Sequence, residues 1–143
     1  MNKRLEFVGK YNDSELFLDF AHHPSSCLET IKTFKKLYPQ KKIIAAFEPR
    51  NASSRRNIFV QQYAQSLSYA DTVLLAPCFE DERIPKSQRM NTKELSAIIK
   101  TTSFAFNSFD HLQNWLIKNL NNKSLVIFMT CADFNNIPHN ISK

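Results

Sequence analysis

The feature that most constrains the fold is a regular alternation of short apolar runs and amphipathic segments. Ile43–Phe47 and Leu125–Met129 are continuous apolar runs, the pattern typical of parallel strands that are buried on both faces. Between such runs, apolar residues recur every three or four positions, which is the spacing of one helix face. This alternation predicts an α/β fold with a mostly parallel sheet and right-handed crossovers.

The individual elements can be assigned from the same pattern. An Asn12-Asp13 turn predicts that the first two strands pair as an N-terminal hairpin. Ser108 is expected to cap a helix that carries Phe109, Leu112, Leu116 and Leu120 on one face. The predicted strands are Leu5–Val8, Leu16–Phe20, Ile43–Phe47, Val73–Ala76, Phe104–Phe106 and Leu125–Met129. The other predicted helices are Ser26–Leu37, Ser53 or Ser54 to Ser68, and Asn91–Lys100.

Length and composition predict one soluble domain over residues 1–143, large enough for a real core. No apolar run approaches the roughly 18 residues of a membrane span, and the first residues lack the apolar region of a signal peptide. The three cysteines have no metal-ligand spacing, so we expect reduced thiols and a cytoplasmic protein without a membrane partner.

The chain is basic, with a net charge of +6. Its basic residues occur in short groups, Lys35-Lys36, Lys41-Lys42 and Arg55-Arg56, without a long basic run. This pattern favours a solvated surface or a small-anion site over nucleic-acid binding. Gly9 is the only glycine, so the chain cannot contain a glycine-rich phosphate loop.

The stretch from Leu16 to Ser26 predicts strand, short loop and helix. Pro24 favours extended backbone at the residue before it, and Ser26 with Glu29 fits a capping box that starts the helix at Ser26. In open α/β sheets, loops at the carboxyl ends of strands line the ligand crevice. We therefore expect Asp19–Ser25, Glu48–Ser53 and Cys78–Pro85 to share one edge of the sheet, with the loop after Met129 nearby.

Two side chains in these loops are candidates for ligand binding. Asp19 ends an apolar strand, and it either accepts hydrogen bonds from a ligand's hydroxyls, holds a cation, or supports its own turn. Arg50 either binds a carboxylate or phosphate with two parallel hydrogen bonds or pairs with a nearby glutamate. The His22-His23 pair is better explained by packing and exposure than by metal binding, and no metal site is predicted. No nucleophile elbow is present.

These loops resemble those of the Mur ligase family, the ATP-dependent amide ligases of peptidoglycan synthesis and recycling. Asp19–Pro24 (D-F-A-H-H-P) is similar to the family motif D-[YF]-[AG]-H-x-P, and Arg4-Leu5-Glu6 resembles the opening of the family's C-terminal domain. Glu48-Pro49-Arg50 resembles the E-P-R-S segment of the member that joins L-alanyl-γ-D-glutamyl-meso-diaminopimelate to UDP-N-acetylmuramate. Thr130–Ile137 departs from the pattern, because it replaces every glycine of a segment similar to S-N-G-G-F-G-G-I.

The resemblance implies that the chain is the third, Rossmann-like domain of a three-domain ligase and is inactive alone. ATP and Mg would be bound mainly by the central domain, and the murein tripeptide and UDP-N-acetylmuramate would be the substrates, without nucleic acid. No catalytic residue is expected within this domain alone. The resemblance assigns Arg4, Asp19 and His22 to the nucleotide side, and Arg50, Glu48 and Asn51 to the peptide side.

Three alternatives remain at this point. The chain could be the corresponding domain of the family member that adds L-alanine. It could also be a stand-alone α/β module that binds a nucleotide or another small anion, or a basic nucleic-acid-binding domain. A preceding segment with a G-K-[ST] phosphate loop would favour the ligase.

Overall fold

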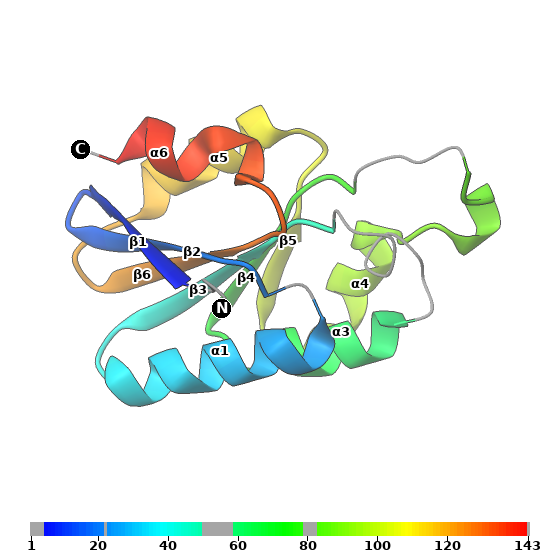
Figure 1. The fold of residues 1–143 in the computed structure, drawn as a ribbon, viewed down its shortest axis with the longest axis horizontal. Helices are drawn as coiled ribbons and strands as arrows, with labels where there is room; N and C mark the ends of the chain where they lie inside the picture. Colours follow the sequence, from blue (N-terminus) through cyan, green and yellow to red (C-terminus); the bar gives the residue numbers. More distant parts are fainter. Residues whose placement is uncertain (1–4, 22, 50–58, 79–82, 143) are drawn as a thin grey trace.

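A computed structural model of the chain describes residues 5–21, 23–49, 59–78 and 83–142. Within these ranges six strands form one sheet in the order β1-β2-β6-β3-β4-β5 (Figure 1). β1 and β2 pair antiparallel, and the other neighbouring strands pair parallel. The strands are β1 (Leu5–Tyr11), β2 (Ser14–Asp19), β3 (Lys42–Phe47), β4 (Thr72–Leu75), β5 (Thr102–Ala105) and β6 (Ser124–Met129). The α/β fold with an N-terminal strand pair is thus confirmed.

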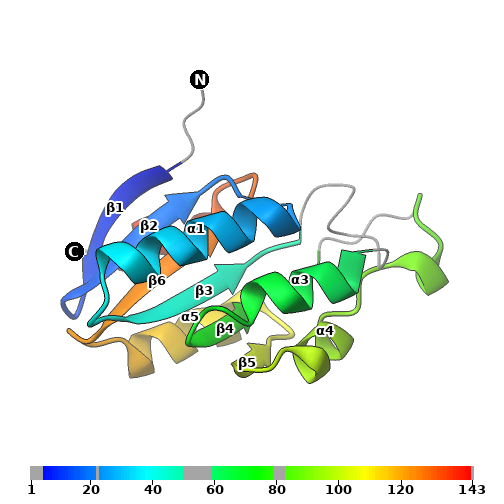
Figure 2. The ribbon, with the colours of Figure 1, turned by 90° about the horizontal axis from the view of Figure 1, so that it is seen from below.

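Helices cover both faces of the sheet, which gives three layers (Figures 1 and 2). One face packs on α1 (Pro24–Leu37), α3 (Val60–Leu67) and α4 (Thr92–Ile98). The opposite face packs on α5 (Phe109–Asn119) and α6 (Ile137–Ile141). Short 3₁₀ turns, η2 (Lys86–Gln88) and η3 (Phe134–Asn136), lie in the loops. Figure 2 shows α1 and α3 running side by side across the sheet. None of the helices in the described ranges is long and apolar enough to cross a bilayer.

The position of β3 inside the sheet explains why its sequence is continuously apolar. Successive side chains of a strand point to opposite faces. Ile43, Ala45 and Phe47 enter the core beneath α1, α3 and α4, whereas Ile44 and Ala46 enter the core beneath α5. Because both faces are covered, all five side chains are at most 2% exposed.

The single glycine has a structural role. Gly9 has φ +151°, and a Cβ atom built on it would lie 2.9 Å from the Cβ of Ser142 near the end of the chain. Glycine is the residue that tolerates both this backbone conformation and this close approach. Asn12 and Asp13 have φ of 52° and 67°, which confirms the predicted hairpin turn, since Asn and Asp accept left-handed backbone.

The start of α1 differs from the prediction. The helix begins at Pro24, with His23 as an extended N-cap that makes no side-chain cap hydrogen bond. The capping box at Ser26 and Glu29 is therefore wrong: Pro fits the first position of a helix, where its missing N–H costs nothing, so the helix starts two residues earlier. An apolar stripe of Leu28, Ile31, Phe34 and Leu37 was expected on this helix, but Leu37 is 66% exposed, so the buried stripe ends before it.

Other element ends are close to the prediction. Asn91 caps α4 by accepting hydrogen bonds from the backbone N–H of Lys93 and Glu94, and the Ser108 side chain caps α5. Strand β5 begins at Thr102, two residues before the start of the predicted Phe104–Phe106 strand. The predicted cap at Ser53 or Ser54 lies outside the described residues.

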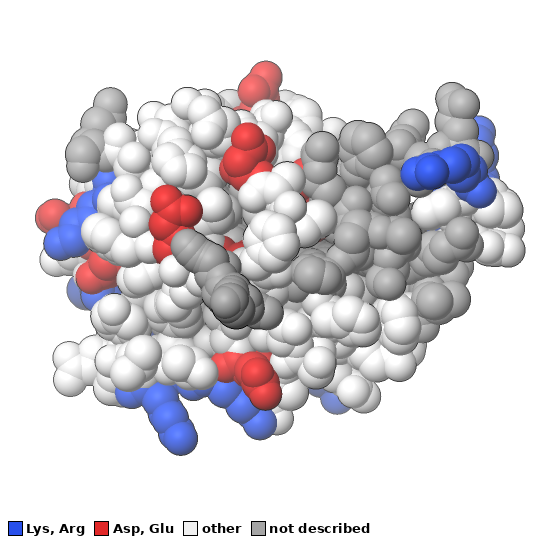
Figure 3. All heavy atoms as spheres, in the orientation of Figure 1, with Lys and Arg blue, Asp and Glu red and all other residues white. Residues whose placement is uncertain are grey.

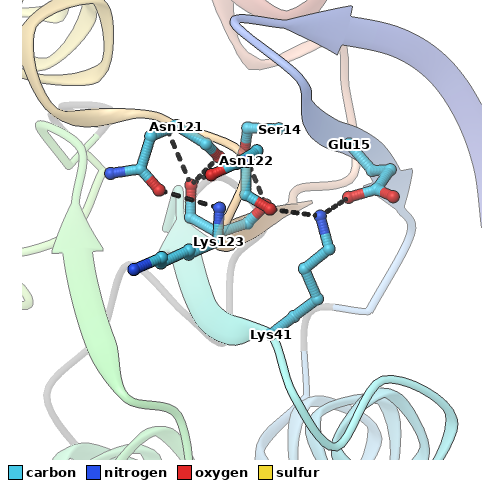
Figure 4. Close-up of polar contacts among 7 residues, drawn as sticks. Ser14, Glu15, Lys41, Asn121, Asn122 and Lys123 are labelled. Atoms are coloured by element: carbon cyan, nitrogen blue, oxygen red, sulfur yellow. Dashed lines mark hydrogen bonds and ion pairs between the residues drawn. The ribbon is translucent and has the colours of Figure 1, made fainter.

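The edge where the parallel strands begin is closed by polar contacts (Figure 4). The Lys41 ammonium lies 2.8 Å from a carboxylate oxygen of Glu15 and donates to the carbonyl of Asn122 at 2.9 Å. Partial burial raises the pKa of Glu15, but the hydrogen bond and charge of Lys41, together with a backbone hydrogen bond and the charge of Lys10, lower the pKa overall. The Ser14 hydroxyl donates to the Ser124 carbonyl at 2.9 Å, linking the starts of β2 and β6.

Candidate functional site

The carboxyl ends of β2, β6 and β3 meet at one edge of the sheet, as predicted. The backbone N–H of Thr130 donates to the carbonyl of Asp19 at 3.0 Å, and that of Glu48 donates to the carbonyl of Met129 at 3.0 Å. The next strand ends at the same edge, where Ala76 donates to Phe47 at 2.9 Å. The two acidic side chains singled out from the sequence therefore lie on either side of the end of β6.

Asp19 is 3% exposed and sits at the end of β2. The Thr30 hydroxyl, from α1, donates to its Oδ2 at 2.6 Å. A buried carboxylate needs such donors to offset the loss of water. Asp19 also lines a pocket of about 270 Å³ together with Leu5, Ala21, Ser26, Glu29, Thr30, Thr33 and Phe34.

The chemistry of this pocket follows from its lining. Asp19 and Glu29 bring carboxylates that can accept hydrogen bonds, and Ser26 and Thr30 bring hydroxyls. Such a lining suits the hydroxyl and amino groups of a polar ligand. The volume of about 270 Å³ falls below the roughly 300–1,000 Å³ of complete ligand sites, so this pocket suits one part of a larger ligand.

Glu48 is buried and supports the structure of the site. It is 2% exposed, and the Thr130 hydroxyl donates to its Oε1 at 2.8 Å. The same hydroxyl oxygen accepts the backbone N–H of Ala132 at 3.0 Å. Thr130 thus joins the residue after β3 to the loop after β6, while its own N–H donates to Asp19 at the end of β2.

We expect Thr130→Val to lower the free energy of unfolding by about 1–3 kcal/mol, the cost of leaving a buried polar group without its partner. Valine keeps the shape of the side chain but removes the donor to Glu48. The measurement is urea unfolding of the 143-residue chain, with Thr130→Ser, which keeps the hydroxyl, as the control. Equal stability of the valine and serine variants would contradict the role assigned to this hydroxyl.

The loop after β6 keeps left-handed backbone without glycine. Phe134, Asn135 and Asn136 have φ of 55°, 55° and 60°. Asn135 and Asn136 stand where the resembling family segment has glycines, and Asn is among the residues that best tolerate this conformation. Phe134 is fully buried and its ring packs edge-on against Phe109 and Phe128, which holds its backbone in place.

Replacing Asn135 and Asn136 by alanine should therefore destabilise the chain. The left-handed conformation costs an ordinary residue about 1–2 kcal/mol, so we expect a loss of that order at each position. The matched control is the Asn135→Gly/Asn136→Gly variant, which we expect to unfold at nearly the wild-type urea concentration. Alanine variants as stable as the glycine variant would show that the loop does not keep this backbone.

The structure leaves some predicted site residues undescribed and adds others. Arg4, His22, Arg50 and Asn51 lie outside the described residues, so their assignments stay predictions. His23 is described, and its ring lies 5.6 Å from that of Phe59. Thr30 and Thr130 were missed by the sequence reasoning. Thr130 carries one usable signal, since it is the first polar residue after a buried strand.

A buried thiol lies beneath this edge. Cys27 of α1 is fully buried, and burial, assisted by the charge of Asp19, raises its pKa well above the ordinary range. The thiol is therefore protonated and unreactive at neutral pH. Among the described residues, no three His, Cys, Asp or Glu side chains come together as a metal site.

Fold and site together define a class of protein. It is an α/β domain with polar loops at the carboxyl edge of its sheet and a buried carboxylate at the end of β2. Residues 3–131 match the family model described as Mur ligase, glutamate ligase domain. The chain therefore belongs to the Mur ligase family, within its C-terminal domain.

Individual relatives agree with this assignment. The chain is 28% identical over 136 residues to a UDP-N-acetylmuramate–L-alanine ligase of Clostridium botulinum, an alignment that covers 92% of the chain and 29% of that protein. Its fold matches the murein peptide ligase of Psychrobacter arcticus with a TM-score of 0.75 and 24% identity, covering 95% of this chain and 28% of that one. The UDP-N-acetylmuramate-alanine ligase of Thermotoga maritima gives a TM-score of 0.68 at 13% identity, covering 94% and 28%. The chain thus spans less than a third of each of these proteins.

Proposed function

We propose that this chain is the C-terminal domain of an ATP-dependent ligase that joins L-alanyl-γ-D-glutamyl-meso-diaminopimelate to UDP-N-acetylmuramate in peptidoglycan recycling. The match of residues 3–131 to the Mur ligase glutamate ligase domain supports the family part of this proposal, and the choice of the tripeptide depends on the resemblance of Glu48-Pro49-Arg50 to E-P-R-S. In the proposed enzyme this domain closes over substrates that a sugar-binding domain and a central domain hold in the cytoplasm. The three free cysteines, Cys27, Cys78 and Cys131, suit that reducing compartment.

The residues at the carboxyl edge suit a closing domain. Asp19, at the end of β2, offers a carboxylate to the hydroxyl groups of the nucleotide, and its pocket is too small for a complete nucleotide. Arg50, two residues after Glu48, is proposed to bind a carboxylate of the incoming peptide. The hydrogen bond from Thr130 holds Glu48 in place, two residues before Arg50 in the sequence.

ATP and Mg fit this domain only in part. Asp19 suits hydrogen bonds to a ribose, but the described residues form no cluster of acidic ligands for a metal ion, and a chain with one glycine has no phosphate loop. We therefore assign the phosphates and Mg mainly to the central domain. Bound there, ATP would supply the phosphoryl group that activates the carboxylate of the UDP-sugar, and Mg would offset the charge of the phosphates.

A second candidate is the domain of a UDP-N-acetylmuramate–L-alanine ligase. The 28% identity to the Clostridium botulinum protein of that name favours it. The tripeptide reading depends instead on Glu48-Pro49-Arg50 and its resemblance to E-P-R-S. The two candidates share the nucleotide side of the site and differ in the amine that they accept.

Purified alone, the 143-residue chain should release no ADP from ATP and should form no amide, because the sugar-binding and central domains are missing. The complete ligase should release ADP only when UDP-N-acetylmuramate and the amine substrate are both present. A coupled ADP assay measures both preparations. Turnover by the isolated chain that survives a second purification would contradict the proposal and favour a self-sufficient enzyme.

A further inference from the structure

A second pocket, of about 790 Å³, lies at the opposite edge of the sheet, where the parallel strands begin. Its lining comes from α5, from strands β3, β4, β5 and β6, and from the turns that precede β3, β4 and β6. We propose that this pocket binds a sugar ring that carries a phosphate or carboxylate group. The proposal does not depend on the function proposed for the carboxyl edge.

The floor of the pocket is polar. Thr72 of β4 is 4% exposed, and its hydroxyl has no hydrogen-bond partner within the described part of the chain. Thr102, its direct partner on β5, brings a second hydroxyl to the same floor. Thr72 is not among the buried side-chain oxygens without a partner in the described residues, so its hydroxyl opens to the pocket and can donate to, or accept from, a hydroxyl of a ligand.

One wall of the pocket is aromatic. Phe104 on β5 is 40% exposed, and its ring centroid lies 5.8 Å from that of Trp115 on α5. Exposed ring faces offer apolar area to the C–H groups of a sugar ring. The side-chain amides of Asn119 and Asn121 line the same pocket and can both donate and accept hydrogen bonds, as the hydroxyls of a sugar require.

The mouth of the pocket is positively charged. Lys42 and Lys123 start neighbouring strands, and the backbone N–H of Lys42 donates to the carbonyl of Lys123 at 2.7 Å. Neither ammonium has an ion pair among the described residues. Figure 4 shows the Lys123 ammonium pointing away from the Lys41–Glu15 pair, so Glu15 does not neutralise it.

The one carboxylate in the lining is already engaged. Asp71 accepts the backbone N–H of Ile43 at 2.8 Å, and its other oxygen lies 3.7 Å from the Lys35 ammonium. Two uncompensated ammonium groups therefore attract an anionic group at the mouth. A bare anion would leave the aromatic wall unused, and an apolar ligand would leave the hydroxyls and amides of the lining unused, so an anionic sugar fits all three parts.

The chain contains a single tryptophan, and it lines this pocket. Fluorescence titration of the 143-residue chain therefore reports on the pocket directly. The probes are glucose 6-phosphate, glucuronate, neutral glucose and inorganic phosphate. We expect a saturable change with at least one of the two anionic sugars, at a Kd at least fivefold below those of glucose and inorganic phosphate. The comparison of the two anionic sugars shows which anionic group is preferred.

Three variants test where the ligand binds. Lys123→Gln should raise the Kd roughly two- to fivefold, the effect of an exposed ion pair, and Thr72→Val roughly two- to tenfold, the effect of one hydrogen bond. Lys118→Gln, an exposed change on α5 outside the pocket, should leave the Kd unchanged. Thermal melting of each variant verifies folding.

Three results would overturn the proposal. The first is the absence of a saturable change with both anionic sugars. The second is a Kd for inorganic phosphate or for glucose equal to that of the anionic sugar. Equal binding of phosphate would show that the ring is not recognised, and equal binding of glucose would show that the anionic group is not. The third is an equal effect of Lys118→Gln and Lys123→Gln, which would indicate general charge attraction instead of a site.

Discussion

Asp19→Asn in the complete ligase is expected to lower kcat/KM about ten- to a hundredfold while the protein stays folded. Asp19 is 3% exposed at the end of β2 and lines the pocket that we assign to the nucleotide. A hydrogen bond to a charged group contributes about 1.5–3 kcal/mol, and about 1.4 kcal/mol corresponds to a factor of ten. Asparagine removes the charge but keeps the size of the side chain and an oxygen that can accept the Thr30 hydroxyl.

The measurement combines steady-state kinetics of the complete ligase with thermal melting of the 143-residue chain that carries the same substitution. We expect the melting temperature of this variant chain to stay within roughly 4 °C of the wild-type chain, about 1 kcal/mol for a domain of this size. Asp110→Asn, an exposed change in the first turn of α5, serves as the control for loss of a carboxylate. A large fall in melting temperature with normal kcat/KM would instead make Asp19 a structural residue.

Arg50→Ala is expected to lower kcat/KM for the tripeptide about ten- to a hundredfold, with the KM for ATP nearly unchanged. Glu48 and Pro49 are both buried, so the backbone is anchored directly before Arg50. The tripeptide is rich in carboxylates, and a guanidinium can hold one through two parallel hydrogen bonds. The expected loss corresponds to about 1.5–3 kcal/mol.

Two further variants sharpen this test. Arg50→Lys should restore only part of the activity, because an ammonium keeps the charge but lacks the planar fork. Arg56→Ala, assigned from the sequence to a solvated helix face, should leave both KM values unchanged. A defect confined to the KM for ATP would place Arg50 on the nucleotide side, and unchanged kinetics would make it a surface residue.

The fold was predictable where burial alone decides the structure. β3 and β6 are buried on both faces, so their sequences are continuously apolar and their assignment is unambiguous. Within the described ranges β5 is an edge strand with one neighbour and a partly exposed face, and its start was misplaced by two residues. The start of α1 was misjudged because the local sequence offers two possible starts. Proline is favoured at the first helical position and serine at the N-cap, so Pro24 and Ser26 are both acceptable near a helix start.

The site was predictable only in part. Asp19 and Glu48 stand out as carboxylates at the ends of apolar runs, and the structure brings them to one edge. Their partners Thr30 and Thr130 depend on contacts across 11 and 82 residues, which no local pattern encodes. The pocket where the parallel strands begin was missed for the same reason, because its residues are scattered over β3, β4, β5, β6, α5 and the turns that precede these strands.

The most direct test of the proposed function is mass spectrometry of the product made by the complete ligase. The assay contains ATP, Mg²⁺ and UDP-N-acetylmuramate, with L-alanine and L-alanyl-γ-D-glutamyl-meso-diaminopimelate at equal concentration. The account predicts that the main product is the tripeptide conjugate. A product that carries L-alanine alone would favour the second candidate, and no UDP-sugar conjugate with either amine from a folded enzyme would contradict the assignment to a muramate ligase.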